Sequence, residues 1–438
     1  MINSKLVRIA VLAGLGALPL SVYATNGMNP EGTGVKNRGM GGAGVALADE
    51  TASITNNPAA VVGVGKRMDV SLGVFSPKTR SYTLTGNDLQ PLYPAGVNFN
   101  GSQESESNLF AIPFFGMAFP IDDKSAWSFV LNANGGMNTN YPANFGENLN
   151  PALTDSTGIN LAQMFANFTY GRKVGSGIDV GITVIGAYQT FKATGLQAFL
   201  GASSDPSAMT DTGTDSSTGV GVKLGIQADV GNGVTLGVAY QSKISMSSFD
   251  KYKGLFPDQG ELDIAPTFSA GVGWKATPKL TWAFDYLYID YGAVNAISNS
   301  TNLYLNQNPT NPCGSNTGDV CFGDSGGPGF GWTSINVYKI GFAYAYSDDW
   351  TWRAGWNHGN NPIANTEVSV NFLAPGIIED HMTLGFTHKL DKDTELSANI
   401  VHSFRKSVSG QFSPSFGGGD MTLEMTQNFF EMGYSKMF

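Results

Sequence analysis

The chain is poor in charged residues. Only 14% of its 438 residues are Asp, Glu, Lys or Arg, against about 25% in an average soluble protein. The formal net charge is −10, and such a chain lacks the basic surface that binds a nucleic-acid backbone. Apart from the N-terminus, no apolar run approaches the roughly 20 residues of a membrane-spanning helix. The composition therefore argues against a nucleic-acid partner and against a helical membrane protein.

Cysteine is scarce as well. The two cysteines, Cys313 and Cys321, lie in one stretch rich in Asn, Gly and Pro. No histidine lies near them, so the pair is a poor metal site. In a secreted chain, two neighbouring cysteines predict a local disulfide. No metal, nucleotide or redox cofactor is expected.

The one long apolar run lies at the N-terminus. Lys5 and Arg8 precede an apolar core at residues 9–20, and residues 22–24 supply the small residues of a cleavage site. This order predicts a secretory signal peptide, residues 1–24, that is cut after Ala24. An uncleaved anchor helix is the alternative, but the apolar core is short. Removal of the peptide would change the formal charge from −10 to −12.

Glycine, in contrast, is abundant, with 56 residues. The stretch 37–62 is rich in Gly and Ala and ends in an Asn-Pro-Ala turn. Dense glycines permit positive φ angles and close backbone approach. We therefore expect a compact, irregular segment with at most a short helix near residues 45–51. A phosphate-binding loop would need a preceding strand and a Lys-Ser/Thr ending, and both are missing. The residues singled out are Gly39, Gly41, Gly42, Gly44, Asn57, Pro58 and Ala59.

The rest of the chain alternates with a period of two, as in residues 178–184, 220–227 and 280–288. One face of each run is apolar and bulky, and the other is small or polar. A soluble β-sandwich also alternates, but here short turns and long polar connections follow each other strictly. That order predicts an all-β fold, a transmembrane antiparallel β-barrel of about 14 strands, with both chain ends on the short-turn side. Strands are expected near 68–77, 107–120, 125–138, 159–174, 177–194, 218–230, 233–246, 261–275, 279–291, 332–347, 350–357, 378–390, 394–408 and 421–438.

Aromatic residues support this interpretation. Those near strand ends suit the girdles of a barrel at the membrane interfaces. On the last strand, alternate residues form one apolar face that ends on Phe438. This ending resembles the signal that the outer-membrane assembly machinery reads. The girdle residues are Tyr291, Trp332 and Trp350, and the last face is Phe430, Met432, Tyr434 and Phe438.

With a signal peptide, a Gly-rich segment that ends in Asn-Pro-Ala and about 14 strands, the chain resembles the FadL family of outer-membrane transport proteins. The resemblance covers residues 25–438 and is most specific at residues 39–61 and 347–355. It implies an N-terminal hatch, residues 25–66, inside a barrel of residues 67–438, with Asn-Pro-Ala at the base of the hatch. It also implies passive transport of long-chain fatty acids or similar amphiphiles, or of aromatic hydrocarbons. The mature start, Thr25-Asn26-Gly27, departs from the more apolar start of the fatty-acid prototype.

The resemblance further implies a route for the ligand: capture on outer loops, transfer to an inner pocket and exit through the wall. Adjacent glycines weaken a strand, so Asn134, Gly135 and Gly136 are candidates for a lateral opening. Two loops carry apolar clusters that we expect to be exposed and to capture ligand. Packing between loops, or contact with outer-membrane lipid and lipopolysaccharide, is the alternative. The capture candidates are Leu196, Phe199, Leu200, Phe249, Tyr252, Leu255 and Phe256.

Other functions stay open at this point. A surface protein for adhesion would need no apolar inner pocket, and a general diffusion porin would carry charged rings around an open lumen without a plug. An enzyme is not expected, because none of the four histidines lies near a recognisable nucleophile motif. We expect a monomer in the outer membrane of a Gram-negative bacterium, with periplasmic termini.

Overall fold

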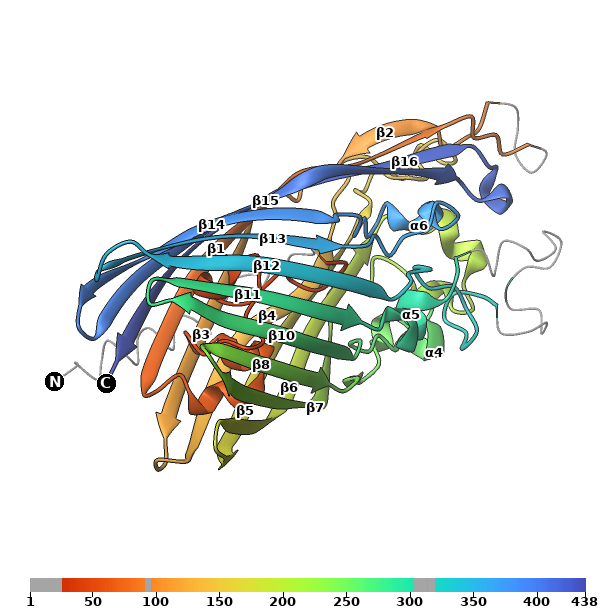
Figure 1. Ribbon diagram of the computed structural model, residues 1–438. Coiled ribbons are helices and arrows are strands. Elements are labelled where there is room, and N and C mark those ends of the chain that lie inside the picture. The colour runs from red at the N-terminus through yellow and green to blue at the C-terminus, as the bar shows by residue number, and fades with distance from the viewer. Residues whose placement is uncertain (1–25, 91–95, 302–312, 314–319) are drawn as a thin grey trace, which may run out of the picture.

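The computed structural model describes residues 26–90, 96–301, 313 and 320–438, so the predicted signal peptide lies outside the described residues. Sixteen strands form one antiparallel sheet in which sequence neighbours pair. Two of them, β2 (Gly101–Glu104) and β9 (Ser245–Met246), are short additions, which leaves fourteen in the wall. The last strand pairs with the first along its whole length, so the sheet closes into a barrel (Figure 1). The predicted fold class is confirmed. Among the described residues, no helix has the length and apolar character to cross a membrane.

The wall strands follow the sequence pattern closely in both order and length. They are β1 (Arg67–Thr85), β3 (Phe110–Pro120), β4 (Ser125–Asn138), β5 (Gly158–Gly175), β6 (Ile178–Thr194), β7 (Asp215–Gly231), β8 (Val234–Gln241), β10 (Thr267–Thr277), β11 (Leu280–Ile289), β12 (Ile335–Ala345), β13 (Trp350–Gly359), β14 (Asp380–Asp391), β15 (Thr394–Gln411) and β16 (Asp420–Met437). The C-terminus lies at the short-turn end of the barrel, opposite the long-loop end (Figure 1).

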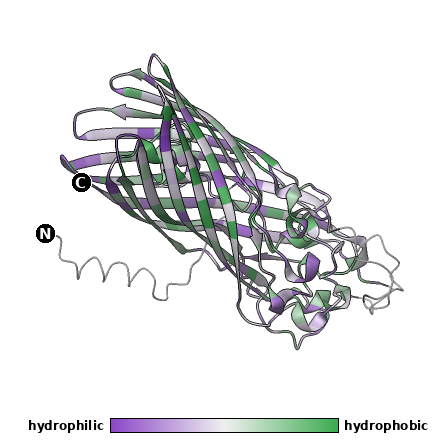
Figure 2. Cartoon of the chain, turned by 90° about the horizontal axis from the view of Figure 1, so that it is seen from below, coloured by the Kyte–Doolittle hydropathy of each residue, from purple (hydrophilic) through white to green (hydrophobic). Residues whose placement is uncertain are grey.

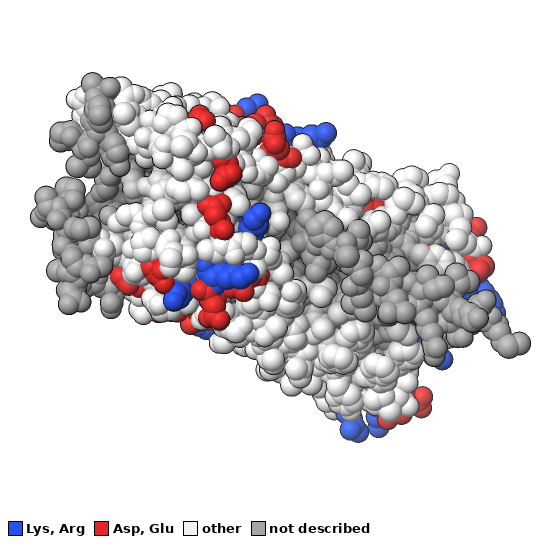
Figure 3. All heavy atoms as spheres, turned by 180° about the vertical axis from the view of Figure 1, so that it is seen from behind, with Lys and Arg blue, Asp and Glu red and all other residues white. Residues whose placement is uncertain are grey.

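Period-two alternation places apolar residues on the outside of the wall. On β7, Val220, Leu224 and Ile226 are exposed, whereas Ser217 and Gln227 are buried on the inside. Hydrophobic and hydrophilic residues alternate along the strands in the same way (Figure 2). On the face seen in Figure 3, charged side chains gather toward the two ends, and the wall between them carries few. This outer surface suits lipid, and closure leaves no unpaired sheet edge.

The Gly-rich segment packs inside the barrel through ion pairs. Arg38 binds Glu31 at 2.6 Å and also pairs with Glu431 of β16, and Lys36 binds Glu395 of β15 at 2.5 Å. All five side chains are largely buried. Buried charges are costly unless they are paired. The paired charges therefore hold the segment in one position on the wall.

The helices of this segment differ from the expectation. They are α2 (Val35–Arg38), α3 (Ser53–Asn56) and η1 (Pro58–Val62), and the expected helix at residues 45–51 is absent from this described stretch. The wall supplies the hydrogen bonds that a helix would have made. The carboxylate of Asp285 accepts the amides of Gly44 and Val45 at 2.6 and 3.0 Å. Gly41 and Gly42 have φ angles of 71° and 77°, which glycine adopts most readily.

Some strand boundaries and side-chain positions also differ. The expected strands 233–246 and 261–275 are shorter, because Ile244 and Ile264 leave the wall and pack inside the barrel with Phe165 and Ile185. Of the expected girdle residues, Tyr291 and Trp332 are 0% and 2% exposed and do not face lipid.

Candidate functional site

Long loops close one end of the barrel over an apolar interior. Their short helices are η2 (Gln197–Ala202), η3 (Pro206–Ala208), η4 (Asp250–Tyr252), α4 (Pro257–Gly260), η5 (Tyr291–Ala293), α5 (Asn295–Ser298), α6 (Val368–Asn371) and η7 (Pro414–Phe416). Most of these helices and the ends of the strands near the long loops share one hydrophobic cluster, to which η3 and α4 contribute no residue. The apolar interior therefore lies directly beneath the loops.

The predicted capture residues belong to this cluster, but their expected exposure is wrong. Leu196, Phe199, Phe249, Tyr252 and Phe256 are buried. The other two, Leu200 and Leu255, are partly buried against the same cluster. The two loops cover each other, so apolar side chains that look exposed in sequence are removed from water. Their role in capture stays a prediction.

Within the cluster lies an apolar pocket of about 40 Å³. Four predicted capture residues, Leu196, Phe199, Leu255 and Phe256, contribute to its lining. A single water needs about 10–15 Å³ on such a measure, so the pocket has room for only a few atoms. Apart from the backbone of Gly329, the lining is apolar side chains. The further lining residues are Ile159, Phe191, Met209, Ala296, Phe322, Pro328, Phe330, Val370 and Leu373.

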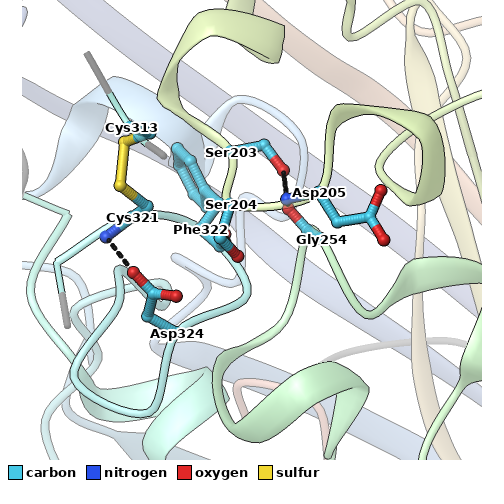
Figure 4. Close-up of a disulfide and its surroundings, with 8 residues drawn as sticks. All are labelled: Ser203, Ser204, Asp205, Gly254, Cys313, Cys321, Phe322 and Asp324. Carbon is cyan, nitrogen blue, oxygen red and sulfur yellow. Dashed lines mark hydrogen bonds between the residues drawn. A yellow bond between two sulfur atoms is a disulfide. The ribbon is translucent and has the colours of Figure 1, made fainter. Parts of the chain in front are cut away.

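The predicted disulfide joins Cys313 and Cys321 (Figure 4). Phe322, which follows Cys321, lines the pocket. Its carbonyl accepts the amide of Ser204 at 2.9 Å, and the amide of Cys321 donates to the carboxylate of Asp324 at 3.1 Å. The disulfide thus anchors a loop segment that forms part of the pocket wall.

An aromatic column leads from the pocket toward β1. Phe145 is its centre: its ring centroid lies 5.8 Å from that of Phe199, 4.7 Å from that of Phe372 and 5.9 Å from that of Tyr82. Tyr141 donates its hydroxyl to the carbonyl of Phe372 at 2.7 Å. The column therefore forms a continuous series of aromatic contacts between the pocket and Tyr82 on β1.

At the wall, the ladder between β3 and β4 is interrupted. It ends at Phe114 opposite Asn132, although β4 continues to Asn138 and stays paired with β5. The two edges meet again where the amide of Glu106 donates to the carbonyl of Asn140 at 2.8 Å. In the part of the chain that the structure describes, no backbone hydrogen bond joins the two edges between these points. We call this stretch the wall gap.

The predicted opening residues, Asn134, Gly135 and Gly136, lie on β4 at the wall gap. The register with β5 shifts between Ala133 and Gly135, so Asn134 is the extra residue of a β-bulge. Its side-chain amide donates to Gln163 at 3.1 Å. The two adjacent glycines therefore lie where β4 makes no ladder with β3. The role of these residues as an exit stays a prediction.

The first described residues cover this part of β4 from inside the barrel. The carbonyl of Met28 accepts the amide of Gly136 at 3.2 Å. A Cβ on Gly135 would lie 1.9 Å from that carbonyl oxygen, so the contact requires glycine there. Tyr291 holds the segment in place, because its hydroxyl donates to Asn26 at 2.7 Å and accepts from Met28 at 2.9 Å. Met28 does not stand out in the sequence, and Tyr291 does so only as an expected girdle residue.

A second cavity, polar and of about 90 Å³, lies between the Gly-rich segment and the wall, and Asn132 and Asn134 of β4 also line it. Its lining includes Lys223, Asp285 and Lys339. Lys223 donates to the carbonyl of Thr55 at 2.6 Å, and Lys339 donates to that of Glu31 at 2.8 Å. Removing apolar surface from water is favourable by about 25 cal/mol per Å², and a ligand in a polar cavity forgoes this free energy. An apolar ligand therefore gains little by moving from the pocket toward this cavity.

The Asn-Pro-Ala turn binds the wall closely. The side-chain amide of Asn57 donates to Val45 and to Ile226 of β7, each at 2.9 Å. A Cβ on Gly225 would lie 2.0 Å from the side-chain oxygen of Asn57, and one on Gly181 would lie 2.3 Å from Pro58. Glycines at inward positions of the strands mark where the segment touches the wall, and the period-two pattern could have revealed them.

Metal chemistry has no support in the described part of the chain, where no group of three or more His, Cys, Asp or Glu residues could hold an ion.

A closed 14-stranded barrel with an apolar outer wall and a filled lumen defines a transmembrane β-barrel of the outer-membrane class. A family model described as "Outer membrane protein transport protein (OMPP1/FadL/TodX)" matches residues 21–428, and the chain belongs to this family. It is a family of transport channels and not of enzymes. The resemblance drawn from the sequence is therefore confirmed.

Solved structures agree on the fold. The toluene transporter TodX of Pseudomonas putida is 17% identical, with a TM-score of 0.64 over 93% of this chain and 99% of that one. A FadL homologue of Pseudomonas aeruginosa is 17% identical, with a TM-score of 0.69 over 94% and 100%. A protein of Chlorobium limicola, described as uncharacterized and encoded in the 5′ region of a phosphoenolpyruvate carboxykinase gene, is 47% identical over 51 residues. That match covers 12% of this chain and only 24% of that protein.

Proposed function

We propose that this protein takes up hydrophobic compounds by passive transport, with binding in the apolar pocket at the long-loop end and sideways exit through the wall gap. The observation that carries the proposal is the pairing of an apolar pocket with a polar cavity. The aromatic column runs from the pocket to Tyr82 of β1 and to Tyr141, which follows the residue where the wall gap ends, whereas polar groups and buried ion pairs fill the direct way through the barrel. The free-energy barrier for an apolar ligand is therefore lowest along the sideways route through the wall gap.

The size of the pocket bears on the cargo. About 40 Å³ leaves room for part of one aromatic ring or a few methylene groups, so a larger ligand requires side chains to move. Long-chain fatty acids and similar amphiphiles remain the cargo that we propose, bound by one end. Aromatic hydrocarbons are the other candidate, because one protein of similar structure is a toluene transporter.

The proposal includes the setting of the protein. We place the long loops outside the cell and the chain ends in the periplasm, with residues 25–66 as a hatch and residues 67–438 as the barrel of a monomer. The apolar face of β16 supports a contact with the assembly machinery during insertion, because Phe430, Met432 and Tyr434 are exposed on the outside of the wall. Lipid and lipopolysaccharide surround the wall.

The test is uptake together with identification of the cargo. Purified protein is extracted with organic solvent, and bound compounds are identified by mass spectrometry. Cells that lack the protein, with and without a plasmid that supplies it, are given labelled dodecanoate and labelled toluene. We expect a bound hydrophobic compound and faster uptake of at least one probe. No bound compound and equal uptake in both strains would contradict the proposal, and large steady ion currents in planar bilayers would support a diffusion porin instead.

A further inference from the structure

Arg80 lies on β1 beside the wall gap, and a local irregularity turns it inward. Lower on β1, the odd-numbered residues face the interior, as Asp69 and Phe75 do. The register with β16 then shifts between Pro77 and Thr79, and Arg80 is buried at 5% exposure. A β-bulge re-aims the side chains that follow it. Without this bulge, Arg80 would face lipid.

The guanidinium of Arg80 bridges the two edges of the wall gap. One nitrogen donates to the carbonyl of Asn138 at the end of β4, and another donates to the carbonyl of Ser107 before β3 begins. The group also lies over the ring of Phe110, 5.6 Å from its centroid. One side chain thus ties two edges that have no ladder between them.

Among the described residues, no carboxylate comes within 4.0 Å of Arg80, so this cation has no counter-ion there. Arg38 and Arg67, in contrast, each have two carboxylates within that distance. The Nε–H of Arg80 is buried and lacks an acceptor. Burial of an unbalanced charge is costly, so an incoming anion would be stabilised at this place.

A carboxylate suits the arrangement better than the two carbonyls do. Hydrogen bonds between two charged groups are about twice as strong as those between neutral groups, and a guanidinium binds a carboxylate through two parallel bonds. When a carboxylate accepts hydrogen bonds from the guanidinium, Arg80 no longer donates to the carbonyl of Asn138 or of Ser107. The tie between the edges is then lost.

We propose that Arg80 is a clamp that closes the wall gap and that the carboxylate of an amphiphilic cargo releases it. The cargo would open its own exit, and neutral hydrophobic compounds of equal length would open it less well. The inference rests on the lateral route of the proposed function, and it adds a gating residue and a preference for acids to that route.

The test compares two probes that differ only in the head group, labelled dodecanoate and labelled dodecan-1-ol. Uptake is measured in cells that lack the protein and carry the wild type, Arg80→Gln or Arg80→Lys. The control is Arg405→Gln, since Arg405 on β15 is exposed and pairs with Glu424 of β16 at 2.6 Å, on the other side of β1 from the gap. Heat-modifiable migration in gels checks that each barrel folds.

In the wild type and in the Arg405→Gln control, we expect dodecanoate to be taken up at least tenfold faster than dodecan-1-ol, after subtraction of uptake without the protein. In Arg80→Gln, we expect the ratio to fall to within twofold of one, with faster entry of the alcohol. Arg80→Lys keeps the charge but offers a single point of contact, so its ratio should lie between the two. An unchanged ratio in both Arg80 variants would overturn the clamp and leave the transport function standing. No uptake of either probe by the wild type would contradict transport of amphiphiles, and no uptake of toluene in addition would contradict the transport function itself.

A second measurement uses the wild-type Arg80 and does not depend on how the variants fold. Spin labels are placed at Leu109→Cys and Asn140→Cys, on opposite edges of the gap; the two native cysteines are joined to each other and stay unlabelled. Added dodecanoate should shift the distance distribution between the labels to longer values, and dodecan-1-ol at equal concentration should not. Equal shifts with both probes, or no shift with dodecanoate, would refute release by an anion.

Discussion

The hydroxyl of Tyr291 accepts a hydrogen bond from the amide of Met28 at 2.9 Å and donates one to the carbonyl of Asn26 at 2.7 Å. Tyr291 comes from η5 at the long-loop end, and Met28 in turn covers Gly136 on β4. A residue of the hydrophobic cluster that contains the pocket therefore holds the segment that covers the wall gap. Movement of the loops on ligand binding would therefore displace the segment that covers the wall gap.

Tyr291→Phe should loosen this segment. The change keeps the ring, which packs against Trp332 at 5.3 Å, but removes two buried hydrogen bonds. Each contributes about 0.5–1.5 kcal/mol, so we expect a loss of about 2 kcal/mol, equal to about 30-fold faster hydrogen exchange near Met28. Exchange measured by mass spectrometry checks this.

The matched control is Tyr252→Phe. The hydroxyl of Tyr252 also makes two buried hydrogen bonds, with Ala193 and Gly213, but none with the N-terminal segment. Hydrogen exchange near Met28 in the Tyr252→Phe variant should equal that of the wild type. Equal exchange in Tyr291→Phe and the control would show that Tyr291 does not hold the segment.

Gly135→Ala should displace the same segment from the other side. The added Cβ would lie 1.9 Å from the carbonyl of Met28. The backbone of Gly135 has no positive φ angle, so the strand itself accepts alanine. We expect a folded barrel with weaker protection of the Gly136 amide, by about fivefold for the loss of about 1 kcal/mol.

Gly186→Ala is the control for that change. Gly186 lies on β6, and its added Cβ would meet only a carbonyl at 3.8 Å, an ordinary contact. Normal protection in Gly135→Ala would mean that the segment does not rest on β4 in solution.

The sequence predicts the barrel well because the barrel follows simple periodic rules. Alternation every two residues and the order of short and long connections depend on local geometry alone, so residues 178–184 and 220–227 indicate strands without any knowledge of their neighbours. Gly39 to Gly44 likewise indicate close packing, since few other residues permit it. The disulfide follows from having only two cysteines.

The site is less predictable because it depends on exceptions to those rules. Arg80 faces inward only because a bulge reverses the pattern on β1. Phe249 and Tyr252 look exposed in a loop, yet they are 0% exposed because a second loop covers them. The carboxylate of Asp285 accepts hydrogen bonds from the amides of Gly44 and Val45, which are far away in sequence. Period and composition carry no information about such distant contacts.

The docking of the Gly-rich segment should depend on pH through Glu50. Burial, and next the nearby Asp69, raise the pKa of Glu50 from 4.5 to about 7, against the opposing effect of Lys36. A raised pKa means that the neutral acid is the favoured form in the docked state. Docking should therefore be strongest below pH 4.5 and weaken as the pH rises through 7, by on the order of 3 kcal/mol.

Glu50→Gln separates this effect from other titrations. The amide oxygen of glutamine can still accept the amides of Lys36 and Asn37, which Glu50 binds at 3.0 and 3.1 Å. Hydrogen exchange of residues 35–56, corrected for its intrinsic pH dependence, should become faster between pH 5.5 and 8.5 in the wild type and much less so in the variant. Parallel profiles in the two proteins would exclude Glu50 as the titrating group.

Ala296→Leu should block the pocket while it leaves the barrel intact. Ala296 lies on α5, is 2% exposed and lines the pocket. Three added carbons occupy most of the free space, and such overpacking costs about 1–3 kcal/mol. We expect at least tenfold weaker retention of the bound compound and slower uptake of both dodecanoate and toluene.

Ala293→Leu is the control, because Ala293 lies three residues earlier in η5, is only half-buried and does not line the pocket. Unchanged retention in Ala296→Leu would mean that the cargo binds elsewhere, and the polar cavity beside the Gly-rich segment would then be the next place to test.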